Sequence, residues 1–140
     1  MRRLAFYVVA ACVLAAGCAG NKPRVAQSVT AMPPGYGVIV ATFRYTAGES
    51  SFPQEQIFSD ARYLEGRLAS RGRQAFIVYG GGNWTSVGFR AATHDEAERA
   101  KAAIEAAGTI DLGDGSTLKV PKVEIVNIAE LKAYALDLIP

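Results

Sequence analysis

The sequence predicts a single α+β domain in which the elements follow one another as strand, helix, strand, strand, helix, strand. Short runs rich in β-branched and aromatic residues at 36–45, 75–79 and 84–92 are typical of strands. Two longer stretches, 52–71 and 94–107, space their apolar residues by three and four, as amphipathic helices do. A glycine follows each of these stretches, where a left-handed helix cap is usual. At 140 residues, the chain has room for one such domain and an export segment.

The chain has no excess of charge beyond its first residues. Its formal charge of +2 comes from Arg2 and Arg3, and the other 13 basic residues balance the 13 acidic ones. Because nucleic-acid binding needs a basic surface, we expect no nucleic-acid partner. Cys12 and Cys18 both lie near the N-terminus, so the remaining chain has neither a disulfide nor a thiolate metal site.

Residues 1–18 have the features of a lipoprotein signal peptide: a cationic start, a short apolar run and small residues before Cys18. The run from Leu4 to Leu14 is shorter than the ~20 apolar residues that span a bilayer. The final LAAGC resembles a bacterial lipobox, although Leu14 lies one place further from the cysteine than usual. We expect a lipid such as palmitate at Cys18. A lipobox that ends at Cys12, or an ordinary signal peptide with an incidental Cys18, are the alternatives.

A lipid at Cys18 would anchor the protein to a membrane in the bacterial cell envelope, facing the periplasm. Ala19 rather than Asp follows the cysteine, which resembles an outer-membrane rather than an inner-membrane address. Residues 19–35 mix Pro, Gly, Ser, Thr and Asn without a period, so we expect a flexible linker there. A strand from Val25 to Val29 is the alternative. The folded domain then occupies 36–140.

Apolar spacing predicts the first strand and the first helix. In the strand at 36–45, alternation places Val38, Val40 and Thr42 on one face and Ile39, Ala41 and Phe43 on the other. The helix at 52–71 has Pro53 in its first turn and a capping box of Ser51 and Gln54. Its apolar stripe consists of Ile57, Ala61, Leu64 and Leu68. Its charged side chains, Arg62, Glu65, Arg67 and Arg71, lie off the stripe and are expected to face solvent.

The next two strands form a hairpin, because the glycines at 80–82 and Asn83 supply the positive φ angles of a tip. Thr93 and Glu96 form the capping box of the second helix. The apolar stripe of this helix is Ala97, Ala100, Ile104 and Ala107, and Gly108 ends it. A small extra hairpin is expected at 110–120, a last strand at 123–128 and a short C-terminal helix at 129–138.

This element order is that of a ferredoxin-like plait, an antiparallel sheet with both helices on one face. The other sheet face is then open, and function in such folds is argued from that face. Alternation places Trp84, Ser86 and Gly88 on one side of their strand, which is the open side if Val87 is in the core. A flat aromatic ring beside small residues suits stacking on a sugar or gripping a partner. Alternatively, Trp84 packs under the C-terminal helix or the extra hairpin.

The sequence contains no set of residues that predicts catalysis or cofactor binding. His94 is the only histidine, so neither a transition-metal site nor a catalytic triad can be assembled around it. Asp111 and Asp114 lack the ligand spacing of a calcium loop and are better explained by turn chemistry. The glycines at 80–82 are not followed by a helix, so they are no phosphate loop. We therefore expect a protein that is not an enzyme and has neither cofactor nor metal.

Several segments resemble the SPOR domain, the peptidoglycan-binding plait of bacterial envelope proteins. The first strand of that family is roughly V-x-V-G-S-F, and this chain has VIVATF from Val38 to Phe43. The third strand ends V-G-x-F, similar to Val87-Gly88-Phe89, and the second helix opens S/T-x-x-E-A, similar to Thr93 to Ala97. The resemblance covers about Gly37 to Ile104.

The resemblance implies non-catalytic binding of peptidoglycan glycan strands through the open sheet face, in cell division or wall organisation. The ligand-binding residues expected on that face are Ile39, Ala41, Tyr79, Trp84, Ser86 and Gly88. The chain departs from the family there, since Ala41 replaces a Gly, Ile39 a common Gln, and Trp84 and Ser86 stand where Arg is frequent. The alternative is a protein-interaction module or homodimer that uses the same apolar face.

Overall fold

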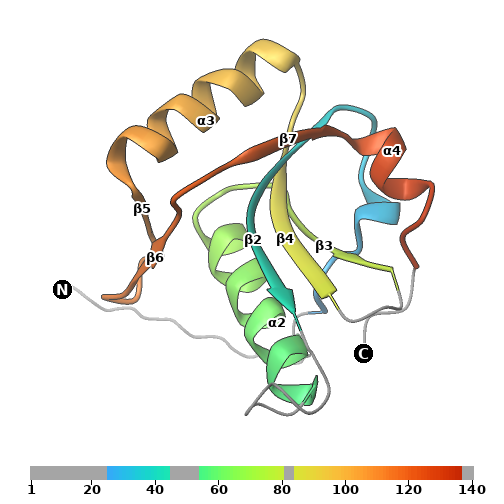
Figure 1. The fold of residues 1–140 in the computed structure, drawn as a ribbon, viewed down its shortest axis with the longest axis horizontal. Coiled ribbons are helices and arrows are strands. Elements are labelled where there is room, and N and C mark those ends of the chain that lie inside the picture. The colour runs from blue at the N-terminus through green and yellow to red at the C-terminus, as the bar shows by residue number, and fades with distance from the viewer. Residues whose placement is uncertain (1–24, 45–53, 81–83, 137–140) are drawn as a thin grey trace, which may run out of the picture.

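The computed structural model describes residues 25–44, 54–80 and 84–136. It is an α+β fold with a four-stranded antiparallel sheet in the order β3-β4-β2-β7 and a separate two-stranded hairpin, β5-β6 (Figure 1). The elements in chain order are η1 (Val29–Ala31), β2 (Tyr36–Arg44), α2 (Gln54–Ser70), β3 (Ala75–Tyr79), β4 (Trp84–Ala91), α3 (His94–Ala107), β5 (Thr109–Asp111), β6 (Thr117–Lys119), β7 (Glu124–Asn127) and α4 (Ile128–Lys132).

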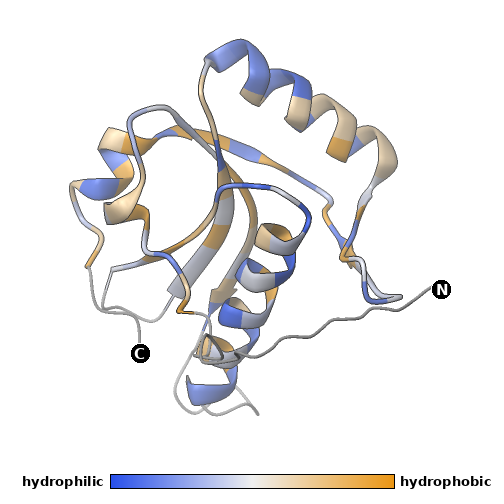
Figure 2. Cartoon of the chain, turned by 180° about the vertical axis from the view of Figure 1, so that it is seen from behind, coloured by the Kyte–Doolittle hydropathy of each residue, from blue (hydrophilic) through white to orange (hydrophobic). Residues whose placement is uncertain are grey.

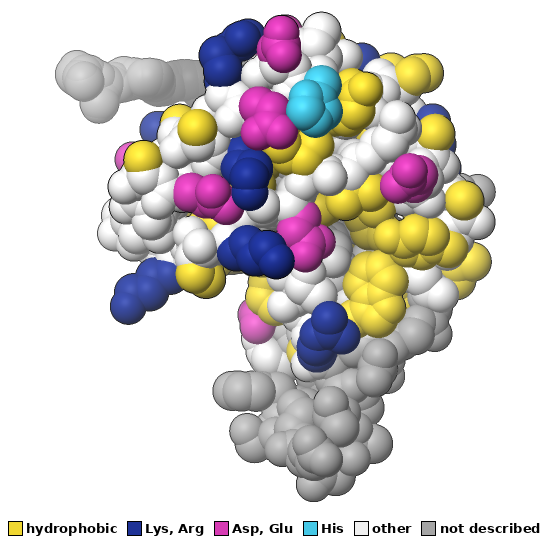
Figure 3. All heavy atoms as spheres, turned by 45° about the horizontal axis from the view of Figure 1, so that its top comes forward, with side chains coloured by type: hydrophobic (Ala, Val, Ile, Leu, Met, Phe, Trp, Pro, Cys, Tyr) yellow, Lys and Arg dark blue, Asp and Glu magenta, His cyan; other side chains and the backbone are white. Residues whose placement is uncertain are grey.

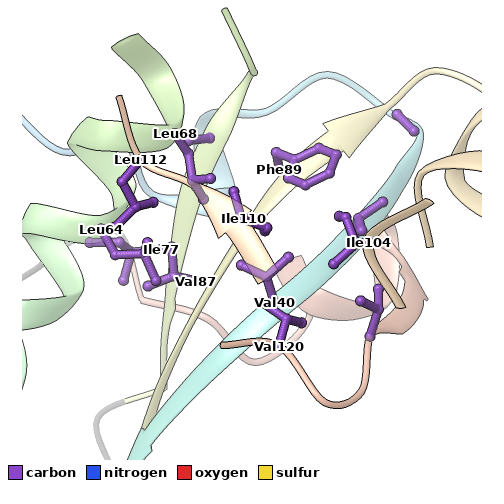
Figure 4. Close-up of a cluster of buried hydrophobic side chains, with 14 of the residues drawn as sticks. Val40, Leu64, Leu68, Ile77, Val87, Phe89, Ile104, Ile110, Leu112 and Val120 are labelled. Carbon is purple, nitrogen blue, oxygen red and sulfur yellow. The ribbon is translucent and has the colours of Figure 1, made fainter. Parts of the chain in front are cut away.

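The main core lies between one face of the sheet and a layer made of α2, α3 and the β5-β6 hairpin. The four apolar positions expected on α2, Ile57, Ala61, Leu64 and Leu68, are all buried. Figure 4 shows Leu64 and Leu68 converging with Leu112 on side chains of the sheet, such as Ile77. Burial of each large aliphatic side chain contributes about 1.5–3 kcal/mol to the stability of the fold, and the main core contains many such side chains.

Helix α3 begins and ends close to where the sequence predicts, but it contacts the sheet through fewer residues. The Thr93 hydroxyl accepts the Glu96 N–H at 3.2 Å, and the Glu96 carboxylate accepts the N–H of Ala92 rather than that of Thr93 itself. Gly108 ends the helix at a φ of 74°. Ala97 and Ile104 are buried, whereas Ala107 is exposed, so the expected stripe was wrong at its last position. Figure 2 shows hydrophilic residues in the first half of α3 and more hydrophobic ones in its second half.

The second face of the sheet is not open, which corrects the expectation from the sequence. Phe76 and Val78 of β3 are fully buried on this face beneath Val29 of η1 and Ile128 of α4. Figure 1 shows α4 beside the blue N-terminal turn that contains η1, and the two segments are in contact. The chain therefore uses its own N- and C-terminal segments to cover apolar strand residues, because leaving them in water would cost more than ordering these segments.

The described part of the expected linker, 25–35, packs onto the domain. The Ile77 N–H donates to the Gln27 carbonyl at 2.8 Å, and Ser28 forms a single parallel bridge with Ile77. The Ser28 hydroxyl then accepts the N–H of Thr30 and caps η1. The alternative of a strand at Val25 to Val29 is thus realised only as one bridge and a 3-10 turn, and the domain extends N-terminally to about Gln27.

The charged flank of α2 is only partly solvated. Glu65 is fully buried, contrary to the expectation, and its carboxylate accepts the Gln27 N–H at 3.3 Å. Arg67 donates its Nε–H to the Leu112 carbonyl at 2.8 Å, while Arg62 and Arg71 are exposed. Glu65 thus fastens the N-terminal segment to the helix, and Arg67 fastens the loop of the extra hairpin.

A bulge in β2 changes which residues of that strand share a face. Ile39 lies opposite Gly88 in β4, but Ala41 already lies opposite Val87, so Val40 is the extra residue. Because side chains alternate with a period of two, one extra residue transfers every later side chain to the other face. Ala41 and Phe43 accordingly pack on the helix side with Val40, whereas Thr42 bonds across the second face to Ser86 at 2.8 Å. The expected faces were correct from Val38 to Val40 and wrong from Ala41 onward.

The C-terminal helix is shorter than expected. α4 ends at Lys132, and the chain continues from Ala133 to Leu136 alongside β3, where the Leu136 N–H donates to the Tyr79 carbonyl at 2.7 Å. The hairpin tip at 81–83, the expected start of α2 at 51–53 and the whole of 1–18, with Cys18, lie outside the described residues.

Candidate functional site

The six expected ligand-binding residues do not share one surface. Trp84, Ser86, Gly88 and Ile39 lie on the second sheet face, but Tyr79 and Ala41 lie on the helix side. The Tyr79 ring packs edge-on against Phe58 of α2, with 5.4 Å between ring centroids. In β3 the second face is occupied by Phe76 and Val78, so alternation directs Tyr79 to the opposite side. The bulge at Val40 does the same for Ala41.

Two of the four residues on the second face are covered by other parts of the chain. Ile39 is only 7% exposed, and Gly88 is buried. A Cβ atom built on Gly88 would overlap the Val38 carbonyl oxygen and lie 3.1 Å from the Ile39 Cα. Gly88 is thus needed so that β2 and β4 can approach closely at the bulge. Of the four residues on this face, Trp84 and Ser86 bring an aromatic ring and a hydroxyl to an accessible groove.

An accessible groove of about 220 Å³ remains at one end of the second face, which we call the aromatic groove. It lies between the last residues of β2, the start of β4, the start of β7 and α4. Ile39, Val78, Val126 and Leu131 form its apolar part, and Thr42, Arg44, Trp84, Ser86, Glu124 and Tyr134 supply its aromatic and polar groups. Figure 3 shows a patch of apolar side chains with both basic and acidic side chains at its border.

Two aromatic rings form one side of the aromatic groove. The rings of Trp84 and Tyr134 are 6.0 Å apart at an interplanar angle of 62°, and Tyr134 is 50% exposed. The Tyr134 N–H donates to the Leu131 carbonyl, so the end of α4 holds this ring over the sheet. Trp84 therefore meets the C-terminal segment, as the alternative prediction had it, while staying at the groove. The sequence analysis missed Tyr134, although its position three residues after Leu131 places both on one side of a helix.

Hydroxyl and charged groups surround the aromatic pair. The Thr42 and Ser86 hydroxyls bond to each other at 2.8 Å across β2 and β4. Arg44 and Glu124 are exposed at the groove, and within the described part of the chain neither forms an ion pair. Aromatic surface with a few hydrogen-bonding groups around it is the usual composition of a small-molecule site.

A second opening, the edge cleft, adjoins the aromatic groove. β2 pairs with β4 from Tyr36 to Arg44 but with β7 only from Tyr36 to Ile39. Among the described residues, the edge of β2 from Val40 to Arg44 has no strand partner on that side. A cleft of about 430 Å³ lies along this edge, with Lys119, Pro121 and Lys122 among its other lining residues. It shares Ile39, Thr42, Arg44 and Glu124 with the aromatic groove.

The helix side has a cleft of about 340 Å³ beside Arg71 and Arg73. The Arg73 guanidinium lies 4.2 Å from the centre of the Phe89 ring, and Arg71 lies 3.7 Å from Asp111. Partial burial, and secondly the charge of Arg71, lowers the pKa of Arg73 below its ordinary value. Because stacking on Phe89 and pairing with Asp111 explain both arginines, this cleft serves the packing of the β5-β6 hairpin.

The acidic residues of the extra hairpin make turns. Asp111 accepts the Gly113 N–H at 2.8 Å and Asp114 accepts the Ser116 N–H at 3.1 Å. Hydrogen bonds from the Ser116 and Tyr63 hydroxyls hold the pKa of Asp114 well below its usual range. Within 25–44, 54–80 and 84–136, no group of His, Cys, Asp or Glu residues could hold a metal ion.

His94 is exposed at the start of α3, where the sequence predicts it. Its Nε2 lies 3.6 Å from a Glu98 carboxylate oxygen, and its ring meets Tyr36 edge-on at 5.2 Å. Both contacts are those of an exposed side chain at a helix start, one of them to the residue a single turn further along α3.

Comparisons with protein-family models, with curated proteins and with solved structures found no match to this chain. The resemblance to SPOR domains therefore rests on the sequence segments quoted above. In the described ranges, no helix combines the length and the hydrophobicity of a membrane span.

Proposed function

We propose that this protein is a non-catalytic, lipid-anchored envelope protein that binds peptidoglycan glycan strands in the aromatic groove. The Trp84–Tyr134 pair is the observation on which the proposal depends, because accessible aromatic rings beside hydroxyl and charged groups suit the apolar faces and polar edges of sugar rings. The element order and the strand order β3-β4-β2-β7 support the finer description of the fold as a ferredoxin-like plait with added terminal segments.

The covered second face changes where the glycan would bind. The sequence placed the ligand over the whole sheet face, but η1 and α4 occupy most of it. The aromatic groove, at about 220 Å³, is smaller than the roughly 300–1,000 Å³ of typical ligand pockets. It therefore suits one sugar ring of a longer strand, whose neighbouring units would lie outside on the surface.

Envelope location is proposed from residues 1–18 alone. Growth of cells with a labelled palmitate analogue should label the wild-type protein and not Cys18→Ala. Label that persists in Cys18→Ala would contradict the anchor at this residue. A lipid at Cys18 would place the domain near a membrane surface.

Co-sedimentation with purified sacculi tests the binding function. Trp84→Ala and Tyr134→Ala should bind much less than wild type, while Tyr63→Ala, which removes an equally exposed tyrosine from α2, should bind normally. Circular dichroism and a thermal melt of each variant separate lost binding from lost folding. If wild type does not sediment with sacculi, the function is wrong; if Trp84→Ala and Tyr134→Ala bind like wild type, the site is wrong.

A protein partner is the second candidate. Tyr134 and Leu136 are 50% and 47% exposed beside the aromatic groove, and exposed large apolar residues are frequent in interfaces. This candidate predicts a dimer in size-exclusion chromatography, or capture of an envelope protein, that sacculi do not change. A monomer that only sacculi can bind would exclude it.

A further inference from the structure

The edge of β2 from Val40 to Arg44 has room for an added strand, and we call it the free edge. Among the described residues, β7 pairs with β2 only as far as Ile39, and the residues beyond it line the edge cleft. A strand edge without a partner presents N–H and C=O groups at the spacing of another extended chain. The free edge is about 17 Å long, so it can pair with a peptide segment of about five residues.

The chain's own β7 does not continue along the free edge, because the segment before it is bonded to the end of α3. The Val120 N–H donates to the Gly108 carbonyl at 2.9 Å, and the Val123 N–H donates to the Glu105 carboxylate at 2.9 Å. Pro121, which has no N–H, lies between these two anchors. The place beside the free edge is therefore left for another chain.

The edge cleft carries more positive than negative charge. Its charged lining residues are Arg44, Lys119, Lys122 and Glu124. All four are exposed, and in the part of the chain that the structure describes none of them forms an ion pair within 4.0 Å. Glu105 lies near enough to Lys122 to feel its charge, but Glu105 is already bonded to Lys101 at 3.1 Å. The three cations are therefore available to an acidic ligand.

The charges of the edge cleft favour an acidic segment of another protein over a second copy of this chain. If two copies paired antiparallel along the free edge, with Thr42 at the centre, Arg44 of each copy would lie beside Val40 of the other. The lysines of both copies would then enter one cleft, and like charges brought together destabilise a strand pair. A segment with carboxylate side chains meets the same cations with attraction, and its backbone supplies the hydrogen bonds.

We propose that the free edge of β2 binds an extended, acidic segment of a partner protein as an added strand. The backbone of the segment bonds to N–H and C=O groups between Val40 and Arg44, and its carboxylates meet Lys119 and Lys122. Glu124 repels a carboxylate at the end of the cleft near β7, so the acidic residues lie toward Arg44. The inference does not depend on glycan binding, since the described lining of the edge cleft does not include the aromatic pair.

The strand pairing is tested with a capped, labelled peptide of about six residues in which Glu and Val alternate, its binding measured by fluorescence anisotropy. One variant of the peptide carries N-methyl groups on every Glu amide, and the other carries them on every Val amide. Successive N–H groups of a strand point to opposite sides, so only one of these two sets faces β2. That methylated peptide should bind about tenfold more weakly or worse, and the other should bind like the parent. Hydrogen exchange should slow at amides between Val40 and Arg44 when the parent peptide is bound.

The preference for acidic side chains is tested by reversing the charge of the peptide. With Lys in place of Glu, it should bind wild type about tenfold more weakly, because exposed ion pairs are each worth little. Lys119→Gln combined with Lys122→Gln should lose most of this difference, and added salt should reduce it in wild type. Arg99→Gln combined with Lys132→Gln, which removes two positive charges outside the edge cleft, should keep it. A thermal melt of each variant confirms that it folds.

The backbone and the charge parts of the inference can each fail separately. Equal binding of the parent and both methylated peptides overturns the inference, because no strand pairing then occurs at β2. An unchanged preference for the acidic peptide after the double lysine change overturns it as well, since the carboxylates would be recognised elsewhere. If wild type binds no acidic peptide, the inference is wrong, while sedimentation with sacculi still decides the proposed function. Weaker binding of one methylated peptide only, together with a preference that the lysine changes remove, supports the inference.

Discussion

Replacing Gly88 by Ala should destabilise the domain strongly. The new methyl group would overlap the Val38 carbonyl oxygen and lie 3.1 Å from the Ile39 Cα and 3.0 Å from the Ile39 Cδ1. Backbone atoms cannot turn away as a side-chain end can, so β2 and β4 must separate at the bulge. Overpacking of this kind costs about 1–3 kcal/mol, and one lost ladder hydrogen bond adds about 1 kcal/mol. We expect a loss near 3 kcal/mol in the free energy of unfolding.

Thermal unfolding measures this loss directly. At roughly 4–8 °C for each kcal/mol in a domain of about 100 residues, Gly88→Ala should lower Tm by about 12–24 °C. Gly115→Ala is the matched control, since its φ of 88° strains an alanine but its Cβ would meet no atom within 4 Å. That variant should lose only about 1 kcal/mol. A Gly88→Ala protein that melts like wild type but no longer sediments with sacculi would refute the packing explanation and return Gly88 to the ligand site.

Three further changes test the cover of the second face and the fastening of α2. Leu131→Ala should cost about 2–5 kcal/mol, measured by urea unfolding, because Leu131 is buried where α4 covers the sheet. Glu65→Leu should cost about 1–3 kcal/mol and increase proteolysis of the N-terminal segment, because the buried carboxylate accepts a backbone N–H from it; unchanged proteolysis would contradict this role. Asp114 has a lowered pKa, so the stability it contributes is present above its unfolded pKa of about 4 and is lost as pH falls below it. Tyr63→Phe removes one of the hydrogen bonds that lower the pKa of Asp114. The Tm of this variant should therefore fall less than that of wild type between pH 6 and pH 3.

Local patterns predicted the elements well because the interactions that set them are local. The apolar spacing of α2, the Thr93 cap and the glycines at 72 and 108 act within one helical turn, and each is found where it was expected. The β5-β6 hairpin was likewise predicted from its turn residues. The buried Glu65 was missed, since its partner segment is 38 residues away in the chain.

The candidate site was predicted less well, because it depends on register and on which segments cover the sheet. Trp84 and Ser86 were placed on the correct face by alternation from Val87 in the same strand. Ala41 was misplaced because a bulge follows Ile39 in β2. Tyr79 was misplaced because Phe76 and Val78 occupy the second face, and alternation then directs Tyr79 to the helix side. Packing of Trp84 under the C-terminal helix was one of the alternatives, but Tyr134 was missed because the sequence did not indicate which residue of that segment would meet Trp84.

The amino-acid sequence by itself determined the order of helices and strands and their approximate ends. Only the tertiary structure decided that the second sheet face is covered, that β2 is bulged at Val40 and that an unpaired edge lies beside an aromatic groove. The physical reason is that a helix period or a cap involves residues within a few positions of each other, whereas register and coverage are settled between segments far apart in the chain. Gln27 against Ile77 and Leu136 against Tyr79 are two such contacts, and the segments that contain Gln27 and Leu136 cover the face that the sequence predicted to be open.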